Sequence, residues 1–167
     1  MDADLAALSE AIGSAALAKR DQRRLLLATA ESCTGGWAAQ VITHTAGSSE
    51  WFDRGFVTYS NESKIGMLGV APETLQQFGA VSPEVAAAMA EGALKNSRAL
   101  ISLAITGIAG PSGGSPGKPV GTVCFAWCRA GQTADAETSF FAGDREAVRR
   151  QAVVYALRGL LLRLDAQ

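Results

Sequence analysis

The sequence predicts an α/β fold, a three-layer α/β/α sandwich around a mixed, mainly parallel sheet with one C-terminal β-hairpin. Three observations favour this class. Short apolar runs of strand length alternate with longer segments of helical periodicity. Two of those runs are continuously apolar, which is typical of strands covered on both faces. Two further β-prone runs follow one another across a short turn, as the strands of a hairpin do.

The first half of the chain contains three expected helices and two expected strands. Leu5, Leu8, Ile12 and Ala16 recur at helical spacing, and the run before Glu31 is apolar throughout. Ser60 or Asn61 can cap the third helix. The expected elements are a helix over 3–19, a strand over 24–30, a helix over 35–45, a strand over 52–60 and a helix over 61–68.

The second half completes the alternation and adds the hairpin. Pro72 opens a short helix, and Ser82 followed by Pro83 is a helix start with a cap and a proline at the first helical position. Asp144 can cap the last helix. The remaining expected elements are a helix from 83 to about 96, a strand over 100–106, two strands over 120–129 and 133–141, and a helix over 144–164.

Composition bounds the class of protein. The 167 residues fit one domain spanning 1–167, and with 48% hydrophobic and 19% charged residues the chain is globular in character. The net charge is −1 and basic residues are scattered, which argues against nucleic-acid or membrane-surface partners. No apolar run approaches the ~20 residues of a membrane span. The acidic start argues against a cleaved secretory signal, and we expect a cytoplasmic protein.

The few cysteines and the single histidine limit the kinds of catalytic and metal-binding site that the chain can form. The chain has three cysteines, no Cys-x-x-Cys pair and a single histidine, His44. Reduced thiols are the default for such a pattern, and no metal site is expected. An enzyme with this sequence must therefore work without a histidine-based mechanism.

The stretch Glu31-Ser32-Cys33-Thr34-Gly35-Gly36 directly follows the first expected strand. Ligands of open α/β sheets bind at the carboxyl ends of strands, and the first N–H groups of a following helix can hold an oxyanion. Ser32 is thus a candidate nucleophile, and the glycines allow a close approach of the backbone to a ligand. Cys33 is a weaker candidate because no histidine is assigned to activate it. The alternative is that Ser32 or Thr34 only caps the helix.

Lys64 is a candidate base. A serine needs a base to take its proton, and with one histidine in the chain a lysine is the obvious substitute. Lys64 lies one helical turn after Ser60 and would point back toward the strand end. To be neutral near pH 7 it needs a lowered pKa, through burial or a neighbouring cation. The alternative is an ordinary solvated lysine.

Two further segments are candidates for binding a substrate. The loop over 107–119 holds five glycines and three prolines, fits neither a P-loop nor a G-x-G-x-x-G pattern, and could still bind phosphate through backbone N–H groups. A mobile surface loop is its alternative. Arg145 stands in a first helical turn, where the helix dipole disfavours a cation, so it either pairs with a phosphate or carboxylate or forms a surface salt bridge.

Taken together, these segments resemble the CinA C-terminal domain family. The matching blocks are 30–36, 47–49, 55–61, Lys64, 69–70, 79–82, 106–111, 118–123 and 143–145. The resemblance covers nearly the whole chain beyond about the first 20 residues. Ala46 stands where proline is expected and Arg54 where a small residue is expected. Both lie outside the proposed chemistry, at positions that could alter the entrance to the site.

The resemblance implies hydrolysis of the carboxamide of nicotinamide mononucleotide (NMN), without metal or cofactor. It implies Ser32 as nucleophile and Lys64 as base, with Tyr59 orienting Lys64 or the substrate. The implied oxyanion hole is the backbone of Cys33, Thr34, Gly35 and Gly36. The implied substrate-binding residues are Thr106, Gly107, Gly110 and Arg145, and Arg145 either binds phosphate or keeps Lys64 neutral. A homo-oligomer is also implied.

Two alternatives stay open at this point. One is a nucleotide-binding partner domain, associated with competence or DNA damage, that has no turnover. The other is an amidase that acts on a different nucleotide or amide. Intact Ser32, Tyr59 and Lys64 argue against the first alternative.

Overall fold

A computed structural model describes residues 1–19 and 24–165. Its helices are α1 (Ala3–Ala18), α2 (Trp37–Ile42), α3 (Asn61–Leu68), α4 (Pro72–Phe78), α5 (Pro83–Lys95) and α6 (Arg145–Asp165), with a 3-10 turn η1 (Ser48–Glu50). Its strands are β1 (Leu27–Glu31), β2 (Phe52–Val57), β3 (Ile101–Gly107), β4 (Thr122–Arg129) and β5 (Asp135–Phe140). The expected alternation and the hairpin β4–β5 are confirmed.

The five strands form one mixed sheet in the order β2-β1-β3-β4-β5. β1 pairs in parallel with β2 and β3, whereas β4 is antiparallel to both of its neighbours. All strands except β4 therefore run in the same direction. The carboxyl ends of β1, β2 and β3 meet at one edge, because Glu31 lies opposite Val57 on one side and Ile105 on the other.

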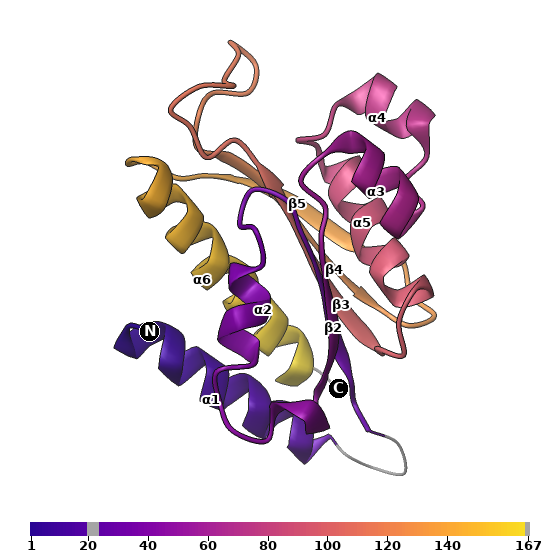
Figure 1. Ribbon diagram of the computed structural model, residues 1–167, viewed down its shortest axis with the longest axis vertical. Coiled ribbons are helices and arrows are strands. Elements are labelled where there is room, and N and C mark those ends of the chain that lie inside the picture. Colours follow the sequence, from indigo (N-terminus) through magenta and orange to yellow (C-terminus); the bar gives the residue numbers. More distant parts are fainter. Residues whose placement is uncertain (20–23, 166–167) are drawn as a thin grey trace.

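The sheet lies between two helical layers, which confirms the sandwich (Figure 1). α1, α2 and α6 cover one face, and α3, α4 and α5 cover the other. Large side chains such as Leu103, Phe125 and Trp127 point to the first face. Their neighbours Ala104, Cys124 and Ala126 point to the second. This alternation of large and small residues lets α5 approach its face of the sheet closely.

The alanine-rich segment of α5 is part of the core. Val85, Ala86, Met89 and Ala90 are fully buried, and the Ser102 hydroxyl of β3 donates to the Ala90 carbonyl oxygen at 2.7 Å.

Among the described residues, no helix is both long and apolar enough to cross a bilayer.

Two predicted boundaries near the β1–α2 and β2–α3 connections were wrong. α2 begins at Trp37 rather than 35, because Gly35 and Gly36 have φ values of +60° and +95°, in the left-handed region. β2 ends at Val57 rather than 60, because the chain turns into the capping box of α3, in which the Ser60 and Ser63 hydroxyls bond each other's backbone N–H. Both differences concern segments that bend toward the same end of the sheet.

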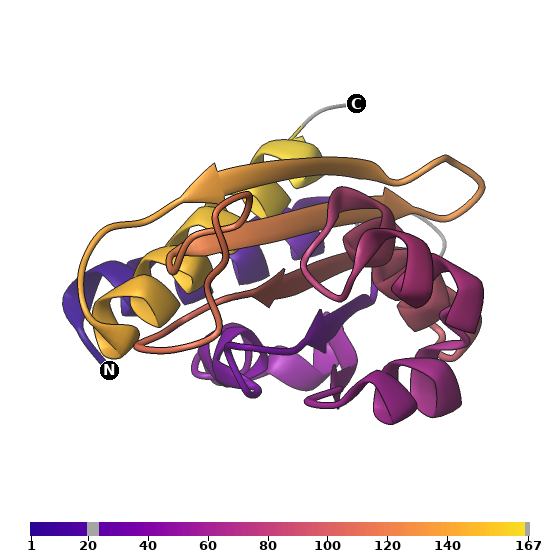
Figure 2. The same ribbon diagram turned by 90° about the horizontal axis from the view of Figure 1, so that it is seen from above.

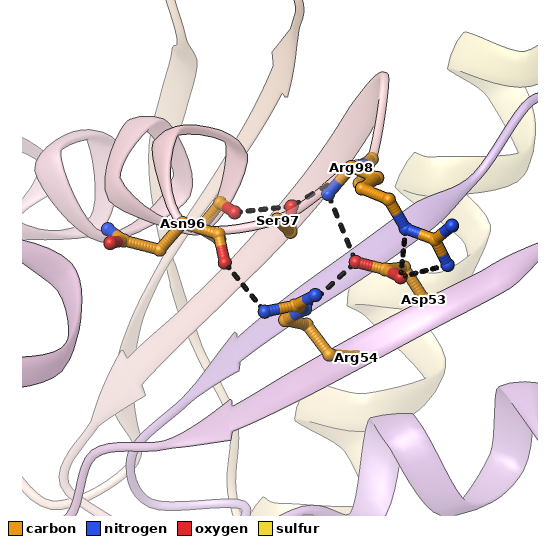
Figure 3. A network of polar contacts seen from close by, with 7 residues as sticks. Asp53, Arg54, Asn96, Ser97 and Arg98 are labelled. Atoms are coloured by element: carbon orange, nitrogen blue, oxygen red, sulfur yellow. Dashed lines mark hydrogen bonds and ion pairs between the residues drawn. The ribbon is translucent and has the colours of Figure 1, made fainter.

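The opposite end of the sheet is held by a polar network (Figure 3). The Asp53 carboxylate of β2 accepts from the backbone N–H and guanidinium of Arg98, which precedes β3, and from the guanidinium of Arg54. Arg54 also donates to the Asn96 carbonyl oxygen at 3.1 Å. Arg54 therefore joins β2 to the α5–β3 turn at the amino ends of the strands, and it does not line the pockets at the carboxyl ends.

Candidate active site

The turn after β1 places Ser32 at the carboxyl end of the strand. Ser32 N–H donates to the Ile105 carbonyl oxygen at 2.9 Å, which continues the pairing with β3. The buried Glu31 carboxylate accepts from the Thr34 hydroxyl at 2.8 Å and from the N–H groups of Ala38 and Ala39 at 2.9 and 3.0 Å. A carboxylate in that position complements the first-turn N–H groups of α2. The helix is thus capped by Glu31, and the Ser32 side chain is left for another role.

Ser32 and Lys64 lie within hydrogen-bond distance of each other. Lys64 Nζ is 3.1 Å from Ser32 Oγ, and it also donates to the Thr58 carbonyl oxygen at 2.9 Å. Lys64 stands in the first turn of α3, whose start is set by the Ser60 capping box. The two residues are 32 positions apart in sequence. They meet because β1 and β2 are parallel neighbours and end at the same edge of the sheet.

Lys64 is buried, with only 2% of its surface exposed. Burial lowers the pKa of its amine, because the charged form loses the water that would stabilise it. Of the two causes that the sequence leaves open, burial is the one that acts here, and no neighbouring cation contributes to the shift. A lysine in this environment can reach the neutral state that a general base requires.

Cys33 is buried beside Ser32 and lacks the environment of a reactive thiol. Burial raises the pKa of the Cys33 thiol to about 11. Its thiolate, which would be the nucleophilic form, is therefore scarce near neutral pH. The geometry favours Ser32 over Cys33 as the nucleophile.

The glycine loop between β3 and β4 folds over the same end of the sheet (Figure 2). A cavity of about 280 Å³ lies there, and its lining includes Ser32, Tyr59, Gly107, Gly110 and Arg145. The Thr106 hydroxyl is buried and donates to the Ala80 carbonyl oxygen at 2.8 Å. Thr106 thus joins β3 to the segment before α5. Of the three residues predicted here to bind substrate, Gly107 and Gly110 line the cavity.

Arg145 and Tyr59 meet at the rim of this cavity. The Arg145 guanidinium donates to the Tyr59 hydroxyl at 2.8 Å and to the Gly110 carbonyl oxygen at 2.9 Å. Arg145 thereby connects the start of α6, the glycine loop and the segment after β2. Tyr59 bonds Arg145 rather than Lys64, and it is 58% exposed. Both side chains are accessible to a ligand that enters from solvent.

Several backbone N–H groups in the turn after Ser32 lack a backbone acceptor. Gly35 N–H donates to the Ser32 carbonyl oxygen at 3.0 Å. Within the described residues, the N–H groups of Cys33, Thr34 and Gly36 donate to no backbone oxygen. These three N–H groups remain for the proposed oxyanion hole, whereas the predicted contribution of Gly35 is already used within the turn.

Arg149 is a residue that the sequence reasoning missed. Its guanidinium donates to the carbonyl oxygens of Cys33 at 3.0 Å and Thr34 at 3.2 Å, and it lies 5.6 Å from the centre of the Trp37 ring. Arg149 follows Arg145 by one helical turn, so both project from the same face of α6. That spacing was the only signal in the sequence, and it gains meaning only once α6 is known to lie beside the turn after β1.

The chain is similar to known proteins over most of its length. The family model of the CinA C-terminal domain matches residues 8–164. The nicotinamide-nucleotide amidohydrolase PncC of Escherichia coli strain K12 is 57% identical over 159 residues, which cover 95% of this chain and 94% of that protein. The protein of the same name from Pseudomonas putida is 56% identical over 133 residues, covering 80% and 82%.

Solved structures show the same fold. The competence/damage inducible protein CihA from Agrobacterium tumefaciens matches with a TM-score of 0.89 and 42% identity, over 99% of this chain and 98% of that one. The competence damage-inducible protein A (ComA) from Klebsiella pneumoniae matches with a TM-score of 0.91 and 40% identity, over 98% and 99%.

Proposed function

The chain belongs to the CinA C-terminal domain family, and from that premise we propose that it is an NMN amidohydrolase with a Ser32–Lys64 pair at its active site. The reaction converts the carboxamide of NMN to the carboxylate of nicotinate mononucleotide and releases ammonia. The names of the relatives that match over more than nine-tenths of both chains support the substrate class. We further propose that residues 1–167 form one catalytic domain, that the protein acts in the cytoplasm without a nucleic-acid partner, and that it assembles as a homo-oligomer.

The observation that carries the proposal is the 3.1 Å separation between Lys64 Nζ and Ser32 Oγ. A hydroxyl that a neutral amine can deprotonate is a competent nucleophile for an amide. Burial of Lys64 supports the neutral amine, and the hydrogen bond to the Thr58 carbonyl oxygen keeps the amine directed at Ser32.

The reaction then proceeds in two halves. Ser32 Oγ attacks the carboxamide carbon while Lys64 takes the hydroxyl proton, and the N–H groups of Cys33, Thr34 and Gly36 stabilise the oxyanion. Loss of one such donor typically costs about 3 kcal/mol of transition-state stabilisation. Lys64 returns the proton to the leaving ammonia. Lys64 then takes a proton from water, which attacks the Ser32 ester, and Lys64 returns that proton to Ser32 Oγ as the acyl C–Oγ bond breaks and the product leaves.

The rest of the cavity accounts for binding of the nucleotide. Arg145 carries a guanidinium at the rim, and guanidinium groups bind phosphate in a bidentate manner. Gly107 and Gly110 bring the loop backbone to the cavity without side chains that would fill it. We therefore propose that Arg145 and the glycine loop bind the phosphate-bearing part of NMN, with Tyr59 beside them.

Release of ammonia from NMN tests the proposal. The unaltered protein should release ammonia, and Ser32→Ala and Lys64→Met should each lower the rate by about 10³-fold or more while the circular dichroism spectrum and Tm stay close to those of the parent. Lys64→Met retains most of the buried apolar volume, so a loss of activity reports the amine. A parent protein that releases no more ammonia than buffer would instead favour a binding domain without turnover.

A comparison of substrates tests the phosphate contact. NMN should be hydrolysed with a kcat/KM at least about 100-fold above those of nicotinamide riboside and nicotinamide, because a charge-assisted phosphate contact contributes roughly 2–3 kcal/mol. Arg145→Ala should lower kcat/KM for NMN and leave the value for the riboside almost unchanged. Equal kcat/KM values for NMN and the riboside would mean that the cavity does not recognise phosphate.

A further inference from the structure

Two charged side chains, those of Glu31 and Arg149, bond the turn that carries Ser32. The sequence places Glu31 next to this turn, but it does not reveal Arg149. Glu31 accepts from the Thr34 hydroxyl and from two N–H groups of α2. Arg149, from α6, donates to the carbonyl oxygens of Cys33 and Thr34. We propose that Arg149 is a positioning residue for the reaction, which fixes the peptide units after Ser32 so that their N–H groups are oriented before substrate binds. The inference rests on the proposed amidohydrolase function.

The peptide unit is rigid, so a bond that fixes its carbonyl oxygen also fixes the direction of its N–H. The Cys33 carbonyl and the Thr34 N–H belong to one planar trans peptide, in which C=O and N–H point in opposite directions. Because Arg149 holds the Cys33 carbonyl oxygen at 3.0 Å, the Thr34 N–H is directed away from α6. That N–H has no backbone acceptor among the described residues and is one of the donors assigned to the proposed oxyanion hole. Two bonds from one planar guanidinium fix two successive peptides at once.

Besides Glu31 and Arg149, two backbone bonds hold the turn: Gly35 N–H donates to the Ser32 carbonyl oxygen at 3.0 Å and Trp37 N–H to the Thr34 carbonyl oxygen at 3.1 Å. Gly35 and Gly36, which follow, have positive φ values and no Cβ, so the backbone there has unusual conformational freedom. A turn with two glycines loses more entropy when it is ordered, and the charge-assisted bonds from Arg149 offset that cost. The guanidinium also polarises the two carbonyls, which makes the N–H groups of the same peptides stronger donors.

Arg149 is itself held in place. It projects from α6 beside Trp37, with the guanidinium 5.6 Å from the ring centre, and its donors to Cys33 and Thr34 are half-buried. Its neighbour Arg150 points elsewhere and pairs with Asp2 and Asp4 of the α1 region. The two arginines are adjacent in sequence but differ in contacts, so Arg150 is a matched control for the loss of one positive charge from this turn of α6.

A second role for Arg149 has to be separated from positioning. Arg149 and Arg145 both line a cavity of about 670 Å³ next to the Ser32 cavity, where a substrate phosphate could also lie. A residue that binds the substrate in its ground state changes KM, whereas one that orients transition-state donors changes kcat. The division of the effect between kcat and KM therefore distinguishes the two roles.

The experiment compares Arg149→Ala, Arg149→Lys and Arg150→Ala with the parent. Arg149→Ala should lower kcat about 30-fold or more with KM within about threefold, since complete loss of an oxyanion donor costs about 10²–10³-fold and a misplaced donor loses part of that. Arg149→Lys should recover little, because an ammonium cannot bond two carbonyls in a fixed plane. Guanidinium chloride at a non-denaturing concentration should restore part of the kcat of Arg149→Ala alone. Arg150→Ala should stay within about twofold of the parent.

Amide hydrogen exchange provides a readout that does not depend on catalysis. In Arg149→Ala the amides of residues 33–36 should exchange faster than in the parent, and in Arg150→Ala they should not. If the parent protein has no amidase activity, the proposed function fails, and exchange at 33–36 still decides whether Arg149 orders the turn. Unchanged exchange, or a raised KM with unaltered kcat, overturns the positioning role. If Arg149→Ala does not fold, Arg149→Lys carries the same two measurements.

Discussion

At the scale of single residues, the site depends on the environment of one amine. Lys64 has the same chemical groups as any surface lysine, but it is buried and bonded to Ser32 and the Thr58 carbonyl oxygen. Burial destabilises the charged form and lowers the pKa of the amine below the usual range of lysine. The function proposed for this residue therefore comes from its surroundings rather than from its type.

The lowered pKa of Lys64 predicts a dependence of activity on pH. The active form is the neutral amine, so kcat/KM should be low in acid, rise as pH increases through the depressed pKa, and then level off. Measurement of kcat/KM between about pH 5 and about pH 10 would reveal this rising limb. Lys64→Arg should be inactive throughout, because a guanidinium does not deprotonate in that range. A flat profile down to about pH 5 would count against a lysine base.

At the scale of elements, the position of α3 decides where Lys64 lies. α3 packs on α5, and at Gly92 an added Cβ would lie 2.1 Å from the Leu68 carbonyl oxygen. A glycine is required there because any side chain would push the two helices apart. The small residues of α5 and of the sheet beneath it thus serve to bring α3, and with it the lysine, close to the end of β1.

Two glycine substitutions test the contact between α3 and α5. Gly92→Ala should lower the free energy of unfolding by about 1–3 kcal/mol and also reduce kcat, because overpacking displaces α3. Gly66→Ala is the matched control on α3, since nothing lies within 4 Å of its added Cβ. It should raise stability by up to about 1 kcal/mol and leave kcat unchanged. Thermal unfolding together with ammonia release measures both; equal stability of the two variants would contradict this account of the packing.

At the scale of the whole molecule, one end of the sheet carries the candidate site and the other is joined by a polar network. The carboxyl ends of β1, β2 and β3 bear the candidate site, and the amino ends are joined by the Asp53 network (Figure 3). Burial by itself would raise the pKa of Asp53, but hydrogen bonds from the Arg98 N–H, the Arg98 guanidinium and Arg54 outweigh it and hold the pKa below its usual value. The side chain of Asp53 is only 3% exposed.

Asp53→Asn should therefore weaken the fold without altering the chemistry. The expected loss is on the order of 1–2 kcal/mol, because the arginine partners are largely exposed. A depressed folded-state pKa contributes stability above the unfolded-state pKa that is lost as pH falls through the folded-state pKa. The difference in Tm between parent and variant should thus be full at neutral pH and shrink in acid. A reduced kcat at a temperature where both proteins are folded would show that the two ends of the sheet are coupled.

What the sequence by itself determined is the set of elements, and it also singled out candidate residues at their ends. Apolar runs, the serine caps at Ser60 and Ser82 and the hairpin signal are local features, and local features predict local structure. Ser32 and Lys64 could be singled out because a chain with one histidine has few other pairs of nucleophile and base. The turn glycines were recognised, but their left-handed φ values, which delay α2 until Trp37, were not.

Only the tertiary structure decided which of those residues meet. The pairing of β1 with β2 brings Ser32 to Lys64, and the packing of α6 beside α2 brings Arg149 to the turn that Glu31 also holds. Tertiary packing elsewhere buries the amine of Lys64 and bonds the Thr106 hydroxyl to the Ala80 carbonyl oxygen. It also brings Arg145 within hydrogen-bond distance of Tyr59 and Gly110. Periodicity specifies which face of an element is buried, but the partner across that face, and hence the pKa of a group between them, depends on residues far away in the chain.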